Sequence, residues 1–254
     1  MKFINTYSGI LLVLVSCVIP LRAVTDDLGS ANAVLSAGHP AEAIASYQAI
    51  LASPRLLSSS APEIWYNLAL AQEKIGDSVA ASLSLRRALL LDPTFQPADR
   101  KLAEILGTLG VPYSADYRQQ VFMRVHPDTL ILGGAILGWI GVFLFVVFLL
   151  APPRRPVLIA LALTLLILGH GSSLFGSLID PRRTAYDAAV VTTKTAPVLR
   201  ATPADSGASL GTMPPGSLIT ILSRNGVWWY VSGGPGHTGW IPSNTVTPLL
   251  PAGS

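Results

Sequence analysis

Catalysis by a nucleophile or by a bound metal needs cysteine, histidine and acidic side chains at suitable spacing, and this sequence offers few of them. Its only cysteine, Cys17, lies in an N-terminal apolar segment, and its four histidines are His39, His126, His170 and His237. The histidines are far apart and share no spacing typical of metal ligands. The sequence therefore predicts no catalytic residue, no metal site and no cofactor, and we do not expect an enzyme.

Aromatic residues near the C-terminus are the other side chains suited to a functional site. The stretch NGVWWYVSGGPGHTGWIPS, residues 225–243, contains three tryptophans. Such large side chains either bury the apolar area that a very small domain needs or form a ligand-binding surface. Because side chains alternate along a strand, one of Trp228 and Trp229 is expected to point inward and the other outward. The outward one, with Tyr230 and Arg200, is a candidate surface for a peptide or a glycan.

Composition points to membrane segments. Of the 254 residues, 50% are hydrophobic and 12% are charged, and the mean hydropathy is +0.52. Soluble globular proteins carry about 25% charged residues. The apolar excess is concentrated in separate runs, which indicates membrane spans beside soluble domains. The net charge of +3 comes from scattered Lys and Arg, so nucleic acid is not an expected partner.

Residues 1–23 have the layout of a secretory signal peptide. One lysine precedes an apolar run over 10–19, Pro20 ends the run, and Ala23 is a small residue suited to cleavage. The run is shorter than the roughly 20 residues that a spanning helix needs. The segment LVSC, which ends at Cys17, resembles a lipobox. A lipoprotein signal, lipidated at Cys17, and an uncleaved anchor are therefore the alternatives to ordinary cleavage.

Two apolar runs without charged residues, 129–151 and 157–179, are each long enough to cross a bilayer as a helix. The link between them, PPRRP at 152–156, is so short that the helices must form a hairpin with both flanks on one side. Its two arginines favour a cytoplasmic turn, although Arg182 and Arg183 follow the second span. With an export signal, this predicts a multi-pass protein of the bacterial cytoplasmic membrane whose soluble domains are both periplasmic.

Small residues recur inside both spans, including Gly134 and Gly138 in the first and Gly169 and Ser173 in the second. Because small residues let helix backbones approach closely in lipid, we expect the two spans to pack on each other, with a partner's helices as the alternative. His170 is the one ionisable residue inside a span. It has no charged partner in the first span, so we expect a neutral histidine at a helix contact.

Residues 62–93, PEIWYNLALAQEKIGDSVAASLSLRRALLLDP, resemble a tetratricopeptide repeat along their whole length. The structural positions that carry the resemblance are Trp65, Leu68, Gly76, Ala81, Ala88 and Pro93. Alanines permit close helix approach, the glycine suits a helix end, and the proline cannot continue a helix. An earlier half-match aligns Gly38 with the glycine of this repeat, and residues 97–108 are similar to a capping helix. The repeat region is expected over 24–110, followed by a linker at 111–128.

The resemblance to these repeats implies partner binding in a groove lined by the first helix of each repeat. Asn67, Glu73 and Lys74 lie on or near such a helix and are the candidate partner-binding residues. A purely structural role is the alternative for all three.

From Ala185 the sequence changes to short β-rich pieces separated by Gly and Pro, which is typical of a small barrel. The stretches VLRATPADSGASLGTMPPGSLITIL, NGVWWYV and GHTGWIP resemble the bacterial SH3 domain in order and spacing, so this domain is expected over 185–250. The resemblance implies a structural role for Gly239 and Trp240, with the tryptophan in the core or at its edge. Core packing is thus expected for two of the three tryptophans.

The expected fold is a multidomain membrane protein, with an all-α repeat region, a transmembrane helical hairpin and a small all-β SH3-like barrel. In their order these modules resemble the Bat E proteins of bacterial aerotolerance operons. That resemblance implies a non-catalytic membrane scaffold that answers stress beside von Willebrand-type membrane proteins and a MoxR-type ATPase. The alternatives are a tether that binds peptidoglycan through its SH3-like domain and a sensor subunit.

Overall fold

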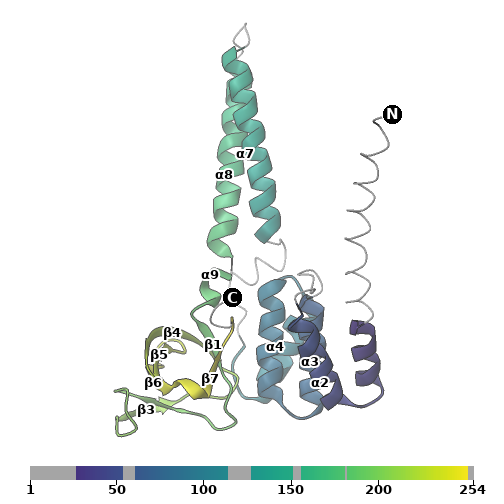
Figure 1. The fold of residues 1–254 in the computed structure, drawn as a ribbon. Helices are drawn as coiled ribbons and strands as arrows, with labels where there is room; N and C mark the ends of the chain where they lie inside the picture. Colours follow the sequence, from purple (N-terminus) through teal and green to yellow (C-terminus); the bar gives the residue numbers. More distant parts are fainter. Residues whose placement is uncertain (1–26, 54–60, 114–126, 151–155, 181, 251–254) are drawn as a thin grey trace, which may run out of the picture. The chain divides into compact units, whose positions relative to one another are not determined.

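The structure is a computed structural model that describes residues 27–53, 61–113, 127–150, 156–180 and 182–250. The predicted signal segment with Cys17, most of the linker and nearly all of the turn at 152–156 lie outside the described residues. The chain divides into two compact units. The first contains the N-terminal helices and the C-terminal strands, and the second contains the two apolar helices (Figure 1).

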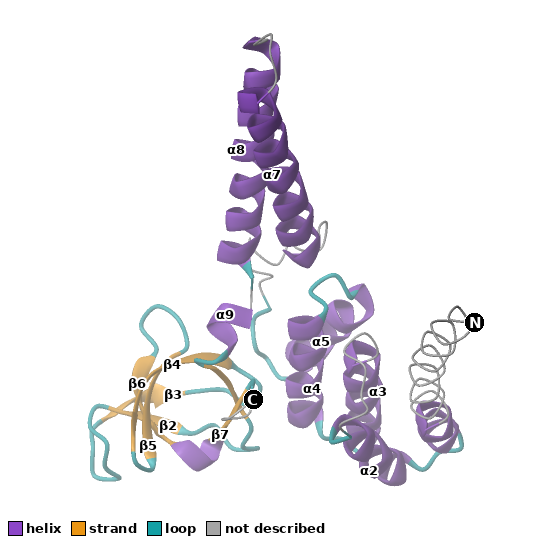
Figure 2. Cartoon of the chain, turned by 45° about the horizontal axis from the view of Figure 1, so that its top comes forward, coloured by secondary structure: helices purple, strands orange, loops and turns teal. Residues whose placement is uncertain are grey.

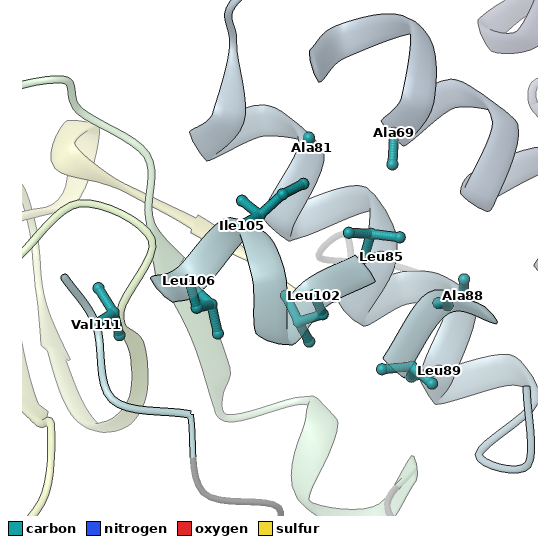
Figure 3. Close-up of a cluster of buried hydrophobic side chains, with 10 residues drawn as sticks. Ala69, Ala81, Leu85, Ala88, Leu89, Leu102, Ile105, Leu106 and Val111 are labelled. Atoms are coloured by element: carbon teal, nitrogen blue, oxygen red, sulfur yellow. The ribbon is translucent and has the colours of Figure 1, made fainter. Parts of the chain in front are cut away.

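The first unit begins with a helix at 27–36, which is followed by α2 (Pro40–Leu51), α3 (Ala61–Lys74), α4 (Ser78–Leu91) and α5 (Gln96–Thr108). Each of the helices α2 to α5 packs on the next one along the chain. Small side chains make this possible, because Ala69, Ala81 and Ala88 are buried where α3 and α4 meet leucines of α5 (Figure 3). A second buried cluster, centred on Tyr47 and Leu68, joins the helix at 27–36 to α2 and α3.

Glycine ends three of these helices in the same way. Gly38, Gly76 and Gly110 have φ values of +89°, +80° and +69°, a region that a side chain disfavours. In each case the residue after the glycine donates its backbone N–H five residues back, as at Asp77 N–H to Gln72 O (2.9 Å). This is the Schellman closure of a helix. At the second site Asp77 then caps α4, because its carboxylate accepts from Ala80 N–H at 3.0 Å.

The second unit contains α7 (Pro127–Leu150) and α8 (Pro156–Ile179), which lie side by side in Figures 1 and 2. Both are long and apolar enough to cross a membrane, over Asp128–Leu150 and Ile159–Leu178. The expected contact between them is present. A Cβ placed on Gly169 would lie 2.3 Å from Gly138 N, and one on Gly134 would lie 2.6 Å from Gly169 O. His170 lies against Gly138, as its place in the sequence predicts, with Nδ1 3.0 Å from Leu166 O.

After the short helix α9 (Arg182–Ala185) the chain forms a seven-stranded antiparallel sheet. Its strands are β1 (Ala188–Val191), β2 (Val198–Arg200), β3 (Ser209–Thr212), β4 (Leu218–Asn225), β5 (Trp228–Ser232), β6 (Thr238–Pro242) and β7 (Val246–Pro248), with a 3₁₀ turn η1 (Ser243–Thr245) before the last. The strand order is β3-β2-β6-β5-β4-β1-β7. The sheet curves strongly around one interior, so we call it the barrel (Figure 2). Its core includes Leu199, Ile219, Val231 and Ile241.

Candidate binding surfaces

The aromatic residues singled out in the sequence come together on the outside of the barrel. Tyr230 on β5 is directly opposite Trp240 on β6, and Trp240 is also opposite Arg200 on β2. Residues opposite each other in antiparallel strands share a face and lie about 5 Å apart. The neighbours Val231, Ile241 and Leu199 point into the core, so this row points outward. The Tyr230 and Trp240 rings are 5.1 Å apart and tilted by 44°.

Trp228 and Pro242 extend the row into a patch. Trp228 lies two residues before Tyr230 on β5 and therefore on the same face, and it is opposite Pro242 on β6. All of these side chains are half-buried. We call the set Trp228, Tyr230, Trp240, Pro242 and Arg200 the outer patch.

Trp229 points the other way, as alternation predicts for one member of the pair. It packs against the core cluster of the barrel, and the Arg224 guanidinium lies 5.4 Å from the centre of its ring. The expectation that two of the three tryptophans pack in the core is wrong, because Trp240 is only half-buried and stands in the outward row. Composition could not show this, since the face of a side chain depends on strand register.

Two features hold the outer patch in place. A Cβ on Gly239 would lie 3.0 Å from Arg200 O and 3.3 Å from Leu199 Cβ, so the absence of a side chain there lets β6 approach β2. The Arg200 guanidinium donates to Gly207 O at 3.0 Å and closes the loop between β2 and β3. The close approach of β6 to β2 thus depends on the small size of Gly239, and Arg200 has a structural bond beside any contact with a ligand.

The outer patch offers two kinds of recognition. Aromatic faces stack against extended, proline-containing peptide or against the C–H faces of a sugar ring. A guanidinium binds carboxylates by paired hydrogen bonds. Together they fit an extended ligand that carries a carboxylate, either a peptide or a peptide-bearing glycan.

The candidates in the helical region have their own contacts. Asn67 Nδ2 donates to Asn32 Oδ1 at 3.0 Å, which joins α3 to the helix at 27–36. Glu73 forms an ion pair with Lys101 of α5 at 2.8 Å. Asn67 and Glu73 therefore connect α3 to other helices of the region, and Lys74 is exposed. Asn32 and Lys101 were missed by the sequence analysis, because nothing in their spacing marks contacts between distant helices.

The residues proposed as structural in the repeat lie in or beside the packed helices α3 and α4. Leu68, Ala81 and Ala88 are buried, and Gly76 forms the turn already described. Trp65 packs between the two helical clusters, where the Arg87 guanidinium lies 4.9 Å from the centre of its ring. Pro93 is buried just after α4 ends.

The described residues include no group of three or more His, Cys, Asp and Glu side chains that could hold a metal. His39 precedes α2, His170 lies in α8, and His237 lies in the loop between β5 and β6. His126 and Cys17 lie outside the described residues.

Comparison with known families gives a match for one part of the chain. Residues 195–247 match the model of the bacterial SH3 domain. No curated protein and no solved structure gives a match to the chain. The barrel is thus similar to a domain family associated with binding to proteins or peptidoglycan, and it is accompanied by two helices suited to a membrane.

Proposed function

We propose that this protein is a non-catalytic, membrane-anchored scaffold that captures partners on the extracytoplasmic side. The outer patch carries the proposal, because it places three aromatic residues and an arginine outward on a domain of a binding family. The two apolar helices supply the anchor. A Bat-type complex that answers aerotolerance stress, with von Willebrand-type membrane proteins and a MoxR-type ATPase, is the assembly that the order of modules favours.

The helical region supports a second binding surface made of tetratricopeptide repeats. Its hairpins are α3 with α4 and the helix at 27–36 with α2. Gly38, Gly76 and Gly110 end the corresponding helices and are 38 and then 34 residues apart in the sequence. The second spacing is the usual period of these repeats. Among the three groove candidates, Lys74 is the exposed one and is therefore the residue to test.

A cell-wall tether is the second candidate function. Peptidoglycan combines sugar rings with short peptides that carry carboxylates, and the aromatic and guanidinium groups of the outer patch suit both. The observation that favours it is the proximity of Arg200 to Trp240 across β2 and β6.

In-cell cross-linking of the tagged full-length protein tests both functions, with mass spectrometry of captured proteins and parallel measurement of captured muropeptides. We expect von Willebrand-type membrane proteins to be recovered. The double variant Tyr230→Ala/Trp228→Ala should reduce their recovery about tenfold, since aromatic anchors dominate binding energy at interfaces. Lys74→Glu tests the helical surface in the same assay.

Val227→Ala is the matched control, because Val227 is 70% exposed on the barrel and lies outside the outer patch. Its capture should equal that of the unaltered protein. Muropeptides alone, lost in the double variant, would establish the tether instead. Unchanged protein capture in both the double variant and Lys74→Glu would exclude both proposed surfaces.

A further inference from the structure

Helix α4 is buried on two faces, and only one of these faces packs against α3 and α5. Ala81, Leu85 and Ala88 belong to the cluster shared with α3 and α5. Leu83 and Leu90, seven residues apart and so on one face of the helix, belong to a different buried cluster. A helix with apolar residues on two faces needs cover on both of them. The face of α4 that carries Leu83 and Leu90, which we call its outer face, therefore requires a partner.

Strand β1 of the barrel supplies that partner. Ala189 and Val191 point into the barrel core, whereas Val190, which points the other way, is also 0% exposed. Val190 is buried in the cluster of Leu83 and Leu90, together with Ala185 and Leu249. A strand at this position of a small barrel is buried on both faces only because α4 covers it.

Arginines of α4 bind main-chain oxygens of the barrel beside this apolar contact. Arg87 Nε donates to Leu249 O at 3.0 Å and its Nη2 donates to Pro248 O at 3.2 Å. The bond to Pro248 O covers part of β7, a strand at the end of the sheet that pairs with β1. Trp65 holds the same guanidinium from the α3 side.

Arg86 makes the second polar contact. Its Nη2 donates to Gly216 O at 3.2 Å, in the turn between β3 and β4. Burial lowers the pKa of Arg86 to about 10, the direction expected for a guanidinium partly withdrawn from water. The turn itself fits closely: a Cβ on Gly216 would lie 2.8 Å from Leu109 Cδ1 and 3.6 Å from Ser82 Oγ.

We propose that the outer face of α4 is a permanent docking surface whose occupant is the barrel of the same chain. Residues 27–91, 95–113 and 185–250 then form one folded head, and the membrane hairpin interrupts this head only in the sequence. Arrays of about two repeats are too short to be stable without cover, since each repeat buries its apolar face only against a neighbour. The barrel gives this cover and stabilises the helices, a role separate from ligand binding at the outer patch.

Hydrogen exchange of the full-length protein in lipid nanodiscs, followed by mass spectrometry, tests the docking. Leu249→Asp places a charge in the shared cluster from the barrel side. We expect the backbone amides of α4 and α5 to exchange at least about tenfold faster, because loss of cover raises the population of locally open states. Leu222→Asp, at an exposed leucine of β4, is the matched control and should leave the helices unchanged.

Loss of protection in β5 and β6 would reveal that Leu249→Asp unfolds the barrel itself. In that case the reciprocal variant Arg87→Gln still tests the docking. It changes the helix side only, and we expect faster exchange in β1 and β7. Unchanged exchange in these strands with Arg87→Gln would overturn the proposal, as would unchanged exchange in α4 with a folded Leu249→Asp barrel. Neither variant alters the outer patch, so failure here is distinct from failure of the proposed binding function.

Discussion

At the scale of single residues, a buried tyrosine of the helical region shares its hydrogen-bond acceptor with Asn67. Tyr47 is 0% exposed, and its hydroxyl donates to Asn32 Oδ1 at 2.7 Å. Asn67 donates to the same oxygen. One side-chain oxygen thus joins three helices, and Asn67 has a structural partner that competes with any role in partner binding.

Tyr47→Phe should therefore lower the free energy of unfolding by about 1 kcal/mol, the usual net value of a buried hydrogen bond. Tyr66→Phe is the matched control, since it also removes a tyrosine hydroxyl from the helical region but keeps the ring contact with Phe95. Chemical denaturation of the full-length protein in detergent, followed by far-ultraviolet circular dichroism, measures the difference. Equal midpoints for the two variants would contradict this assignment.

The same tyrosine predicts a pH dependence. Burial raises the pKa of Tyr47 above its ordinary value, so the unfolded chain loses the phenolic proton at a lower pH than the folded chain does. Its contribution to stability is complete below about pH 10 and is lost as pH rises through the folded pKa. Between about pH 9 and pH 11 the denaturation midpoint of the unaltered protein should fall more steeply than that of Tyr47→Phe. Parallel slopes would contradict the prediction.

The aromatic residues show what the sequence could and could not predict at this scale. Alternation correctly separates Trp228 from Trp229, because a strand has only two faces. The position of Trp240 depends on its register against Tyr230 and Arg200, which come from other strands. No local pattern contains that information, so the outer patch could be predicted only in part.

At the scale of elements, the hairpin shows the closest agreement with the sequence. Length, apolarity and the spacing of small residues predict two packed helices, and α7 and α8 are in contact at those glycines. For helix α4, by contrast, the sequence did not predict what covers it. Its leucines at positions 83 and 90 could have indicated a third covering element, but nothing local says that the cover comes from a barrel about 100 residues later in the sequence.

The hairpin contact predicts opposite results for two neighbouring glycines of α8. Gly169→Leu would drive its side chain into Gly138 N and Gly134 O, whereas a Cβ on Gly171 meets nothing within 4 Å. Overpacking of this kind costs about 1–3 kcal/mol. The thermal aggregation midpoint in detergent should therefore fall for Gly169→Leu and stay unchanged for Gly171→Leu. Equal midpoints would mean that the two helices do not rely on this contact in the membrane.

At the scale of the whole molecule, the proposed docking and the hairpin both predict that the two soluble regions lie on the same side of the membrane. Two spans joined by a short link return the chain to the side from which it came. The contacts of α4 with Pro248 of β7 and with the β3–β4 turn join residues that precede the hairpin in the sequence to residues that follow it. We therefore predict that both soluble regions lie on one side of the membrane, and the signal-like N-terminus predicts that this side is extracytoplasmic.

A cysteine introduced into each region tests this topology without relying on protease access to a folded head. Lys74→Cys reports on the helical region, Val227→Cys on the barrel and Arg154→Cys on the predicted cytoplasmic turn. The unaltered chain, with Cys17 alone, gives the background. A membrane-impermeant maleimide added to spheroplasts should label the first two variants and not the third. Labelling of only one soluble region would contradict both the hairpin and the docking. Labelling of Arg154→Cys alone would reverse the orientation and leave the docked head intact, because the contacts between α4 and the barrel do not depend on which side they face.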